Sequence, residues 1–222
     1  MTRLVIKLGG RVASGAASQV LDLVASGHQV CLVHGAGPQI SSEMERLGLP
    51  VEFVRGRRVT TAAGLEVVRA SLATMNRALC EALGPRAIGL FGDEIGLEAT
   101  PVPELGLVGD PLPCHPAAIE SALEAGLIPV VAPLAEGPLN VNADEAAAAL
   151  AVGLGVARIL FHTDVAGLLL EGAVVRSIAA DEADRLLDDG ELEGGIVPKL
   201  RAAVTAARLG LRAEIGETAV IG

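Results

Sequence analysis

The chain has 222 residues, 51% of them apolar, a net charge of −10 and three aromatic residues, all Phe. This length suits one large α/β domain or two lobes that share a sheet. The negative charge argues against nucleic acid and anionic membranes as partners, so we expect neither. No signal peptide precedes the first predicted strand and no uncharged apolar run reaches 18 residues, so we expect a cytoplasmic protein.

Short apolar runs alternate along the chain with longer segments of helical periodicity. Strands are predicted at 3–8, 29–33, 86–91, 128–132, 158–162 and 173–176. Helices are predicted at 16–26, 38–47, 61–83, 116–125, 143–154, 181–188 and 197–209. This alternation predicts an α/β fold with an open, mostly parallel central sheet and helices on both faces. The Gly- and Pro-rich stretch 92–115 predicts a hairpin or extended loop, and the segment AEGPLN predicts a lobe boundary near residue 135, which gives lobes 1–135 and 136–222.

Glycine-marked loops follow the first two predicted strands. The first strand ends at Gly9 and Gly10, and the second runs into HGAGP with Gly35, Ala36 and Gly37. In open α/β sheets ligands bind at the carboxyl ends of the strands, and glycines there allow close backbone approach and unusual φ values. The two loops predict an anion cradle at a helix N-terminus, although a glycine turn between a strand and a helix is also ordinary packing.

Lysine is rare in this chain. Lys7 and Lys199 stand against fifteen arginines. Lys7 lies in the apolar run LVIKLGG, where a charge is costly unless something anionic meets it, and Lys199 follows GGIVP. A lysine kept against this bias suggests a compact charge that grips phosphate oxygens, with a solvated surface charge as the alternative reading.

The segment RGRRVT at 55–60 places three arginines around a glycine, just before a long predicted helix. Such a cluster could clamp a carboxylate through bidentate contacts, and Arg58 is the candidate. Arg55 and Arg57, taken singly, fit a solvated basic loop better.

The segment NVNADE at 140–145 precedes an alanine-rich helix. Asn142 is predicted to cap this helix, and Glu145 to complete a capping box. Asp144 would be favourable in the first turn through the helix dipole alone. Capping leaves Asn140 unexplained and does not require Asp144, so both are candidate site residues.

The segment FHTDVAGLL puts Thr163, Asp164 and Gly167 just after a strand, as a turn or as a loop that contacts a nucleotide. Cys31, Cys80 and Cys114 show no metal-binding spacing, and the four histidines form no triad with a marked nucleophile. We therefore expect no resident metal site.

Taken in this order, the motifs resemble the amino acid kinase family, and most strongly its acetylglutamate kinases. The matching segments are VIKLGG at 5–10, VHGAGP at 33–38, GRRVT at 56–60, NVNAD at 140–144, TDVAGLL at 163–169 and GGIVPK at 194–199. The resemblance implies a three-layer sandwich with an acyl-amino-acid lobe followed by a nucleotide lobe. It also implies transfer of a phosphoryl group from ATP, with Mg²⁺, to the side-chain carboxylate of N-acetyl-L-glutamate in arginine biosynthesis.

The resemblance further implies roles for single residues. Lys7 would contact the transferring phosphoryl group from the substrate side and Lys199 from the nucleotide side, while Asp144 would hold both lysines. The remaining implied roles are phosphoryl-oxygen binding by the backbone N–H groups of Gly9, Gly10, Ala36 and Gly37, substrate binding by Gly35, Ala36, Arg58 and Asn140, and nucleotide contacts by Gly9, Thr163, Asp164 and Gly167.

This chemistry agrees with the residues that the chain lacks. The acceptor carboxylate is already ionised, so no protein nucleophile or general base is needed. Phosphoryl transfer depends mainly on positioning and on charge neutralisation. The missing His or Ser constellation is therefore what this reaction predicts.

Two alternatives stay open. The first is a related kinase whose aminoadipate or glutamate is presented on an acidic carrier protein; the arginines at 55–58 favour it and the net charge argues against it. The second is a catalytically silent ligand-binding protein on the same fold. The short segment after the last strand-like residues motivates the second, and it leads us to expect weak discrimination between ATP and GTP.

The resemblance also favours a homodimer, formed mainly through the helix at 61–83 and without feedback by arginine, because no sensing extension precedes the first strand. One side of that helix carries apolar residues at helical spacing, which could pack on the sheet or on a partner. These residues are Leu65, Val68, Leu72, Met75, Leu79 and Leu83.

Overall fold

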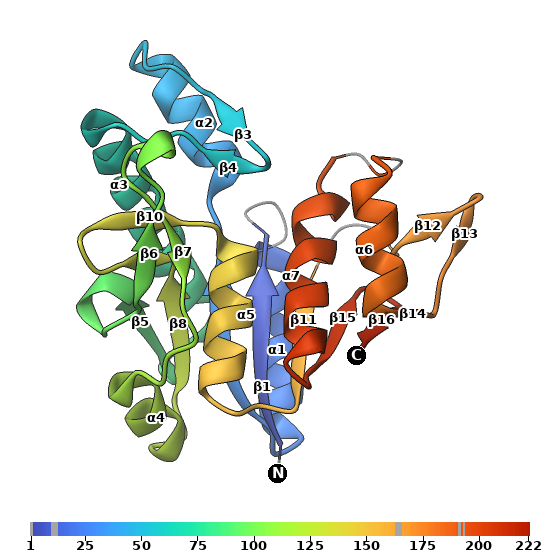
Figure 1. Ribbon diagram of the computed structural model, residues 1–222. Coiled ribbons are helices and arrows are strands. Elements are labelled where there is room, and N and C mark those ends of the chain that lie inside the picture. Colours follow the sequence, from blue (N-terminus) through green and yellow to red (C-terminus); the bar gives the residue numbers. More distant parts are fainter. Residues whose placement is uncertain (1, 10–12, 163–165, 191, 193) are drawn as a thin grey trace.

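The computed structural model describes residues 2–9, 13–162, 166–190, 192 and 194–222 of the chain. Its centre is an eight-stranded sheet in the order β14-β16-β15-β11-β1-β2-β8-β5 (Figure 1). Among these strands every neighbouring pair is parallel except β15 and β16. The predicted α/β fold with a mostly parallel sheet is confirmed.

The strands of the central sheet are β1 (Arg3–Leu8), β2 (Gln29–His34), β5 (Ala87–Phe91), β8 (Ile128–Ala132), β11 (Arg158–His162), β14 (Ser177–Ala179), β15 (Arg212–Ile215) and β16 (Thr218–Ile221). The helices are α1 (Ala13–Ala25), α2 (Gly37–Arg46), α3 (Ala62–Leu83), α4 (Ala117–Glu124), α5 (Ala143–Gly153), α6 (Ala180–Asp188) and α7 (Ile196–Arg208). All seven predicted helices are confirmed, with ends that differ by three residues or fewer.

Smaller β elements surround the sheet. A second sheet joins β6 (Ala99–Pro101), β7 (Val108–Pro111), β10 (Leu139–Val141) and β9 (Leu134–Ala135), and two hairpins are formed by β3 (Phe53–Val54) with β4 (Arg57–Arg58) and by β12 (Leu169–Leu170) with β13 (Ala173–Val174). The antiparallel β6–β7 pair confirms the hairpin predicted in 92–115.

The strand predicted at 173–176 is wrong as part of the sheet. Ala173–Val174 pairs with Leu169–Leu170 in a separate hairpin, and Ser177–Ala179 forms the edge of the central sheet instead. Strands of two to four residues carry too little alternation to be placed by periodicity. Strand β16 was not predicted for the same reason. It follows a tight turn at Gly216, which has a φ of +55°, and pairs antiparallel with β15.

Helix α3 buries its predicted apolar face within the chain. Leu65, Val68, Leu72, Leu79 and Leu83 are each at most 5% exposed and belong to two core clusters. The helix packs on α2, α1, β5 and β8. The expectation that part of this face meets a partner is therefore wrong for these five residues, because the chain itself already covers them.

Both faces of the central sheet carry helices (Figure 1). On β1, Leu4, Ile6 and Leu8 pack in the cluster that includes residues of α1 and α3, whereas Val5 packs in the cluster that includes residues of α5 and α7. Alternate residues of a strand project to opposite faces, so Lys7 lies on the α5 side. Within the described ranges no helix is long and apolar enough to cross a membrane.

Candidate active site

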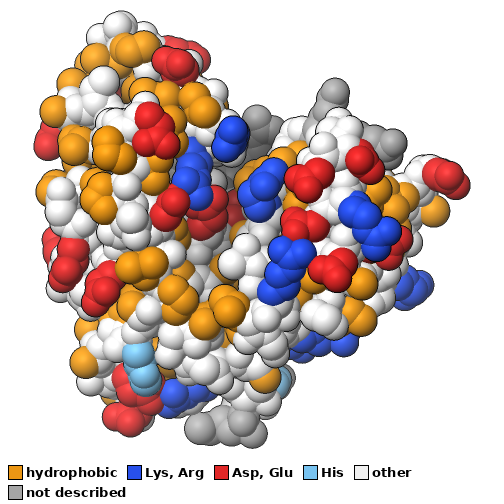
Figure 2. Space-filling model, viewed as in Figure 1, with side chains coloured by type: hydrophobic (Ala, Val, Ile, Leu, Met, Phe, Trp, Pro, Cys, Tyr) orange, Lys and Arg blue, Asp and Glu red, His pale blue; other side chains and the backbone are white. Residues whose placement is uncertain are grey.

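A cleft of about 840 Å³ opens at the carboxyl ends of the central strands. Figure 2 shows the hollow between the two halves of the molecule, with basic side chains on both of its sides. The first residues of α2, α5 and α7 line it. A helix N-terminus presents N–H groups and the positive end of the helix dipole, so a cleft lined by three of them favours an anionic ligand.

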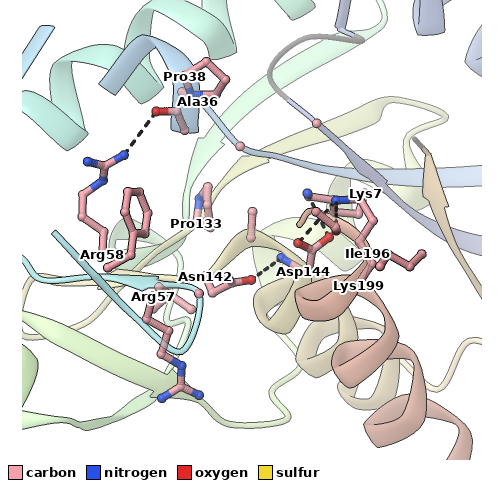
Figure 3. Close-up of a pocket in the computed structure, with 18 of the residues that line it drawn as sticks. Lys7, Ala36, Pro38, Arg57, Arg58, Pro133, Asn142, Asp144, Ile196 and Lys199 are labelled. Atoms are coloured by element: carbon pink, nitrogen blue, oxygen red, sulfur yellow. Dashed lines mark hydrogen bonds and ion pairs between the residues drawn. The ribbon is translucent and has the colours of Figure 1, made fainter. Parts of the chain in front are cut away.

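Lys7, Asp144 and Lys199 form a cluster of charges at the centre of the cleft (Figure 3). Lys7 Nζ lies 2.9 Å from Asp144 Oδ1, and Lys199 Nζ lies 4.0 Å from Asp144 Oδ2. Lys199 Nζ also donates to the Gly195 carbonyl at 3.3 Å. Lys7 is 5% exposed and Asp144 is 4% exposed. One buried and one partly buried cation around a single carboxylate leave a net positive charge.

The sequence explains how these charges meet. Lys7 comes two residues after Val5 on the strand face that packs against α5, near the end of β1. Asp144 lies in the first turn of α5, where the Asn142 side chain accepts from the Asp144 and Glu145 N–H groups at 2.8 and 3.3 Å. The predicted cap by Asn142 is therefore confirmed. Capping fixes the first turn and so directs the Asp144 carboxylate toward β1.

The glycine loop after β2 does not use the unusual φ values that its glycines allow. Neither Gly35 nor Gly37 has a positive φ, and Ala36 has a φ of −139°, which any residue adopts easily. The Gly35 N–H donates to the Leu8 carbonyl at 3.0 Å, so Gly35 belongs to the strand pairing rather than offering its N–H to a ligand. Ala36 is the N-cap of α2 and makes no side-chain hydrogen bond to the first turn of this helix, whose second residue, Pro38, has no N–H.

Gly37 lines the cleft, and a Cβ placed on it would meet no atom within 4 Å. The space beside this residue is therefore open toward a ligand. Gly9 lines the same cleft from the end of β1. Gly10, which we expected to bind the phosphoryl group, lies outside the described residues.

Arg58 is 6% exposed, yet its hydrogen-bond partners are all neutral. Nη2 donates to the Gly37 carbonyl at 3.2 Å and to the Ser41 hydroxyl at 2.8 Å, and Nη1 lies 3.4 Å from the Met44 sulfur. The guanidinium stacks over the Phe53 ring at 4.5 Å. Burial lowers the pKa of Arg58, and no carboxylate of the described residues pairs with it. A buried cation without a counter-ion at the wall of a cleft predicts an anionic ligand group.

Asn140 lines the cleft from β10, beside Arg58. Its Nδ2 donates to the Thr60 hydroxyl at 2.9 Å, and that hydroxyl donates to the Arg58 carbonyl at 2.9 Å. This chain of hydrogen bonds ties the amide of Asn140 to the backbone of Arg58. The structure thus brings together Lys7, Asp144, Lys199, Arg58 and Asn140 around one cleft, as the motifs predict.

Two expectations about neighbouring residues are wrong. Arg57 is not solvated, because it pairs with both Asp110 and Glu145. Glu145 consequently uses its carboxylate on Arg57 and does not complete a capping box with Asn142. Sequence spacing suggested the capping box, but it could not show that β4 would bring an arginine to the same place.

Gly167 lines the cleft on the side of α7 and has a φ of +155°. A Cβ there would lie 2.5 Å from the Thr218 hydroxyl, so glycine is required by close packing against β16. Thr163 and Asp164, the other expected nucleotide contacts, lie outside the described residues.

His34, the last residue of β2, and Asn76 of α3 form a buried polar pair that no motif of the sequence predicts. His34 is fully buried, and Asn76 Nδ2 lies 3.1 Å from its Nε2 and 2.8 Å from the Val130 carbonyl. Because Nδ2 is a donor, Nε2 of His34 accepts, and burial lowers the pKa of His34 to about 4. A polar Asn within the apolar periodicity of α3 is the signal that could have revealed this pair.

A mostly parallel α/β sheet whose cleft presents two lysines, a buried arginine and three helix N-termini defines an anion-binding protein suited to phosphorylated ligands. The model of the amino acid kinase family matches residues 2–216, and the chain belongs to this family. The acetylglutamate kinase of Rubrobacter xylanophilus is 42% identical over 224 residues, which cover 97% of this chain and 88% of that protein. The acetylglutamate kinase of Geobacillus kaustophilus is 38% identical over 91% of this chain and 84% of that protein.

Solved structures share the fold. The protein smu.665 from Streptococcus mutans superposes with a TM-score of 0.87 at 30% identity, covering 99% of this chain and 98% of that chain. N-acetylglutamate synthase from Neisseria gonorrhoeae, complexed with coenzyme A and L-arginine, superposes with a TM-score of 0.83 at 21% identity over 99% of this chain and 61% of that chain. The second likeness concerns the fold alone.

Proposed function

We propose that this protein transfers the γ-phosphoryl group of ATP to the side-chain carboxylate of N-acetyl-L-glutamate, as an acetylglutamate kinase of arginine biosynthesis. The relatives at 38–42% identity carry that name. The observation that carries the proposal is the placement of a buried and a partly buried lysine around Asp144, in a cleft whose other wall holds a buried arginine that pairs with no carboxylate of the described residues.

The lysine cluster suits the transferring group. The equatorial oxygens of a phosphoryl group in flight carry distributed negative charge, which fixed cations and backbone N–H groups stabilise. Lys7 would approach from the β1 side and Lys199 from α7, and Asp144 holds both without neutralising both. The Gly37 amide at the start of α2 and the Gly9 loop would offer further donors.

Arg58 suits the acceptor. Its planar fork could bind the α-carboxylate of N-acetylglutamate through two N–H groups, and this contact would supply the counter-ion that no described carboxylate provides. Asn140 lies beside it with its amide fixed by Thr60. The acceptor's side-chain carboxylate would then extend along the cleft toward Lys7, ready to attack the phosphorus as an ionised nucleophile.

The residues present fit Mg²⁺ that is carried by the nucleotide. Among the described residues no three His, Cys, Asp or Glu side chains are grouped to hold an ion, and Asp144 is engaged by lysines. Mg²⁺ commonly keeps several waters and binds through substrate phosphates. When bound, it would neutralise phosphate charge. Gly167, which lines the cleft, supports a nucleotide on the side of α7, with Thr163 and Asp164 as further expected contacts.

The two lobes would divide these tasks. Residues 1–135 would bind the acceptor and residues 136–222 the nucleotide. Strand β10 pairs with β7 and β9, which supports a boundary a few residues later than 135, at the start of α5, so that Asn140 would belong to the acceptor lobe.

We also infer a cytoplasmic homodimer. The cysteines are free, which suits a reducing compartment. Because the apolar face of α3 is covered by the chain itself, the partner would meet other parts of α3 and the sheet edge at β5, where Ile88, Leu90 and Phe91 are only partly buried. Light scattering that shows a monomer would contradict the dimer.

The alternative kinase for a carrier-bound acceptor loses its main support. The basic segment at 55–58 does not form an open docking face, because Arg58 is buried and Arg57 is held by two carboxylates. Only Arg55 of the three is exposed.

The test is an assay of ADP release with N-acetylglutamate, glutamate and UMP as separate acceptors. Hydroxylamine in a parallel reaction would trap an acyl phosphate as a hydroxamate. We expect ADP and hydroxamate with N-acetylglutamate in equal amounts. Turnover with another acceptor alone would refute the proposed function, and no turnover with any would favour a silent ligand-binding protein.

A further inference from the structure

The β3–β4 hairpin (Phe53–Arg58) carries two neighbouring arginines that point in opposite directions (Figure 3). Arg58 reaches the start of α2, whereas Arg57 reaches β7 and α5. Successive residues of a strand project to opposite faces, so the two-residue strand β4 gives each arginine its own direction. Arg58 has a role in the proposed function, and Arg57 has none so far.

Arg57 binds two carboxylates from two different elements. Its Nε and Nη2 donate to Glu145 Oε1 at 3.2 and 3.1 Å, and Nη1 pairs with Asp110. The Arg57 side chain is 25% exposed and that of Glu145 is 21% exposed. Because a guanidinium is planar and its donors are fixed, two partners on separate elements determine its position closely. Burial raises the pKa of Glu145 and the positive charge of Arg57 opposes this shift, so Arg57 acts as the counter-ion of this carboxylate.

The hairpin touches the chain next to two candidate active-site residues. Glu145 directly follows Asp144 in the first turn of α5. A Cβ placed on Gly56 would lie 3.9 Å from the Pro198 Cβ, which is van der Waals distance, and Pro198 directly precedes Lys199 on α7. The hairpin that carries Arg58 is therefore held against the first turn of α5, which carries Asp144, and lies beside the first turn of α7, which carries Lys199.

We propose that Arg57 is a positioning residue, which through Asp110 and Glu145 fixes the β3–β4 hairpin over the cleft and so holds Arg58 where the acceptor's α-carboxylate binds. The inference rests on the proposed function, because it assumes that Arg58 meets this carboxylate. Arg57 itself does not touch the acceptor. Its loss should therefore weaken acceptor binding through the freedom of the hairpin, and it should leave nucleotide binding unchanged.

The experiment compares Arg57→Met, Glu145→Gln, Asp110→Asn and the double variant Arg57→Met/Glu145→Gln. Arg55→Met is the matched control, since Arg55 lies on the same hairpin and is exposed. Calorimetry should show N-acetylglutamate affinity reduced about tenfold in Arg57→Met and severalfold in Glu145→Gln, with the double variant close to Arg57→Met, because coupled partners are not additive. Affinity for ATP should stay within about twofold of wild type.

A second readout needs no substrate. Amide hydrogen exchange in residues 53–58 should be faster in Arg57→Met and Glu145→Gln than in wild type, while Arg55→Met should leave it unchanged. Equal losses of acceptor and ATP affinity, additive losses in the double variant, or unchanged exchange would overturn the positioning role. If the wild-type protein does not phosphorylate N-acetylglutamate, the proposed function fails, and the exchange rates still decide whether Arg57 holds the hairpin.

Discussion

The two ends of the cleft handle buried positive charge in opposite ways. Around Asp144 the protein supplies its own counter-ion, so Lys7 and Lys199 are held in place before any ligand arrives. At the other end Arg58 is as deeply buried as Lys7, but its partners are a carbonyl, a hydroxyl and a thioether. The end with Asp144 is preorganised to stabilise the transferring phosphoryl group. The end with Arg58 holds a cation whose counter-ion would come from the ligand.

This difference assigns different kinetic roles to the two ends. Fixed charges that act on the transferring group lower the barrier of the chemical step and should determine kcat. A cation that pairs with a non-reacting carboxylate contributes to binding before and during the reaction, so it should determine KM for the acceptor. Mutations at the two ends should therefore change different parameters.

The largest expected effect comes from removing a lysine. Lys199→Ala should lower kcat by about 10²–10³-fold, the scale for one preorganised donor. Lys7→Ala should do the same and should also destabilise the fold by about 3–5 kcal/mol, because it leaves the buried Asp144 with a weaker partner. Steady-state kinetics and urea unfolding measure both. Arg201→Ala, an exposed cation on α7, is the control, and near-normal kcat in Lys199→Ala would contradict the assignment.

A smaller effect is expected on stability at low pH, because His34 is buried next to the glycine loop. His34 has a folded pKa of about 4 against an ordinary value of 6.5, so the unfolded chain takes up the proton first as the pH falls. Stability should therefore be complete above pH 6.5 and fall by about 3 kcal/mol on acidification to pH 4. Urea unfolding between pH 4 and 7 measures this slope. His34→Gln should flatten it, and an identical slope in that variant would show that other groups cause it.

At the acceptor end, Arg58→Lys replaces a fork by a point charge. We expect KM for N-acetylglutamate to rise about 10–100-fold, the scale of lost hydrogen bonds to a charged group, while KM for ATP barely moves. Varying each substrate in turn at saturation of the other measures the two values. A change in the ATP value alone would place Arg58 in the nucleotide site.

The smallest effect concerns the helix that presents Asp144. Asn142→Ala removes the side chain that accepts from the Asp144 and Glu145 amides, and should cost about 1 kcal/mol of stability. Asn142→Asp keeps an acceptor and should recover most of that loss. Thermal unfolding at pH 7 compares them, and equal stability of Asn142→Ala and wild type would show that the cap contributes nothing.

The secondary-structure elements and the residues of the cleft could be predicted from the sequence, whereas the contacts between distant elements could not. Long periodic segments and glycine-marked strand ends located the parallel sheet and the residues of the cleft. Contacts between elements far apart in the chain cannot be seen in the sequence. For this reason the solvated position predicted for Arg57 and the capping box predicted for Glu145 are both wrong. The apolar face of α3 could equally have met a partner, because periodicity shows that a face is buried but not what covers it. Gly35 and Gly37 allow unusual φ values, but neither of them uses this freedom in the structure, and a Cβ on Gly37 would meet no atom within 4 Å.

The most direct test deletes the proposed interaction between Arg58 and the α-carboxylate, once from the protein and once from the substrate. N-acetylglutamate would be compared with 4-acetamidobutyrate, which lacks the α-carboxylate, in the wild-type enzyme and in Arg58→Met. If Arg58 meets this carboxylate, its deletion should lower kcat/KM about 100-fold in the wild type and less than about threefold in Arg58→Met, because the interaction is already gone. An equal loss in both enzymes would show that the carboxylate binds elsewhere and that the buried charge of Arg58 has another counter-ion.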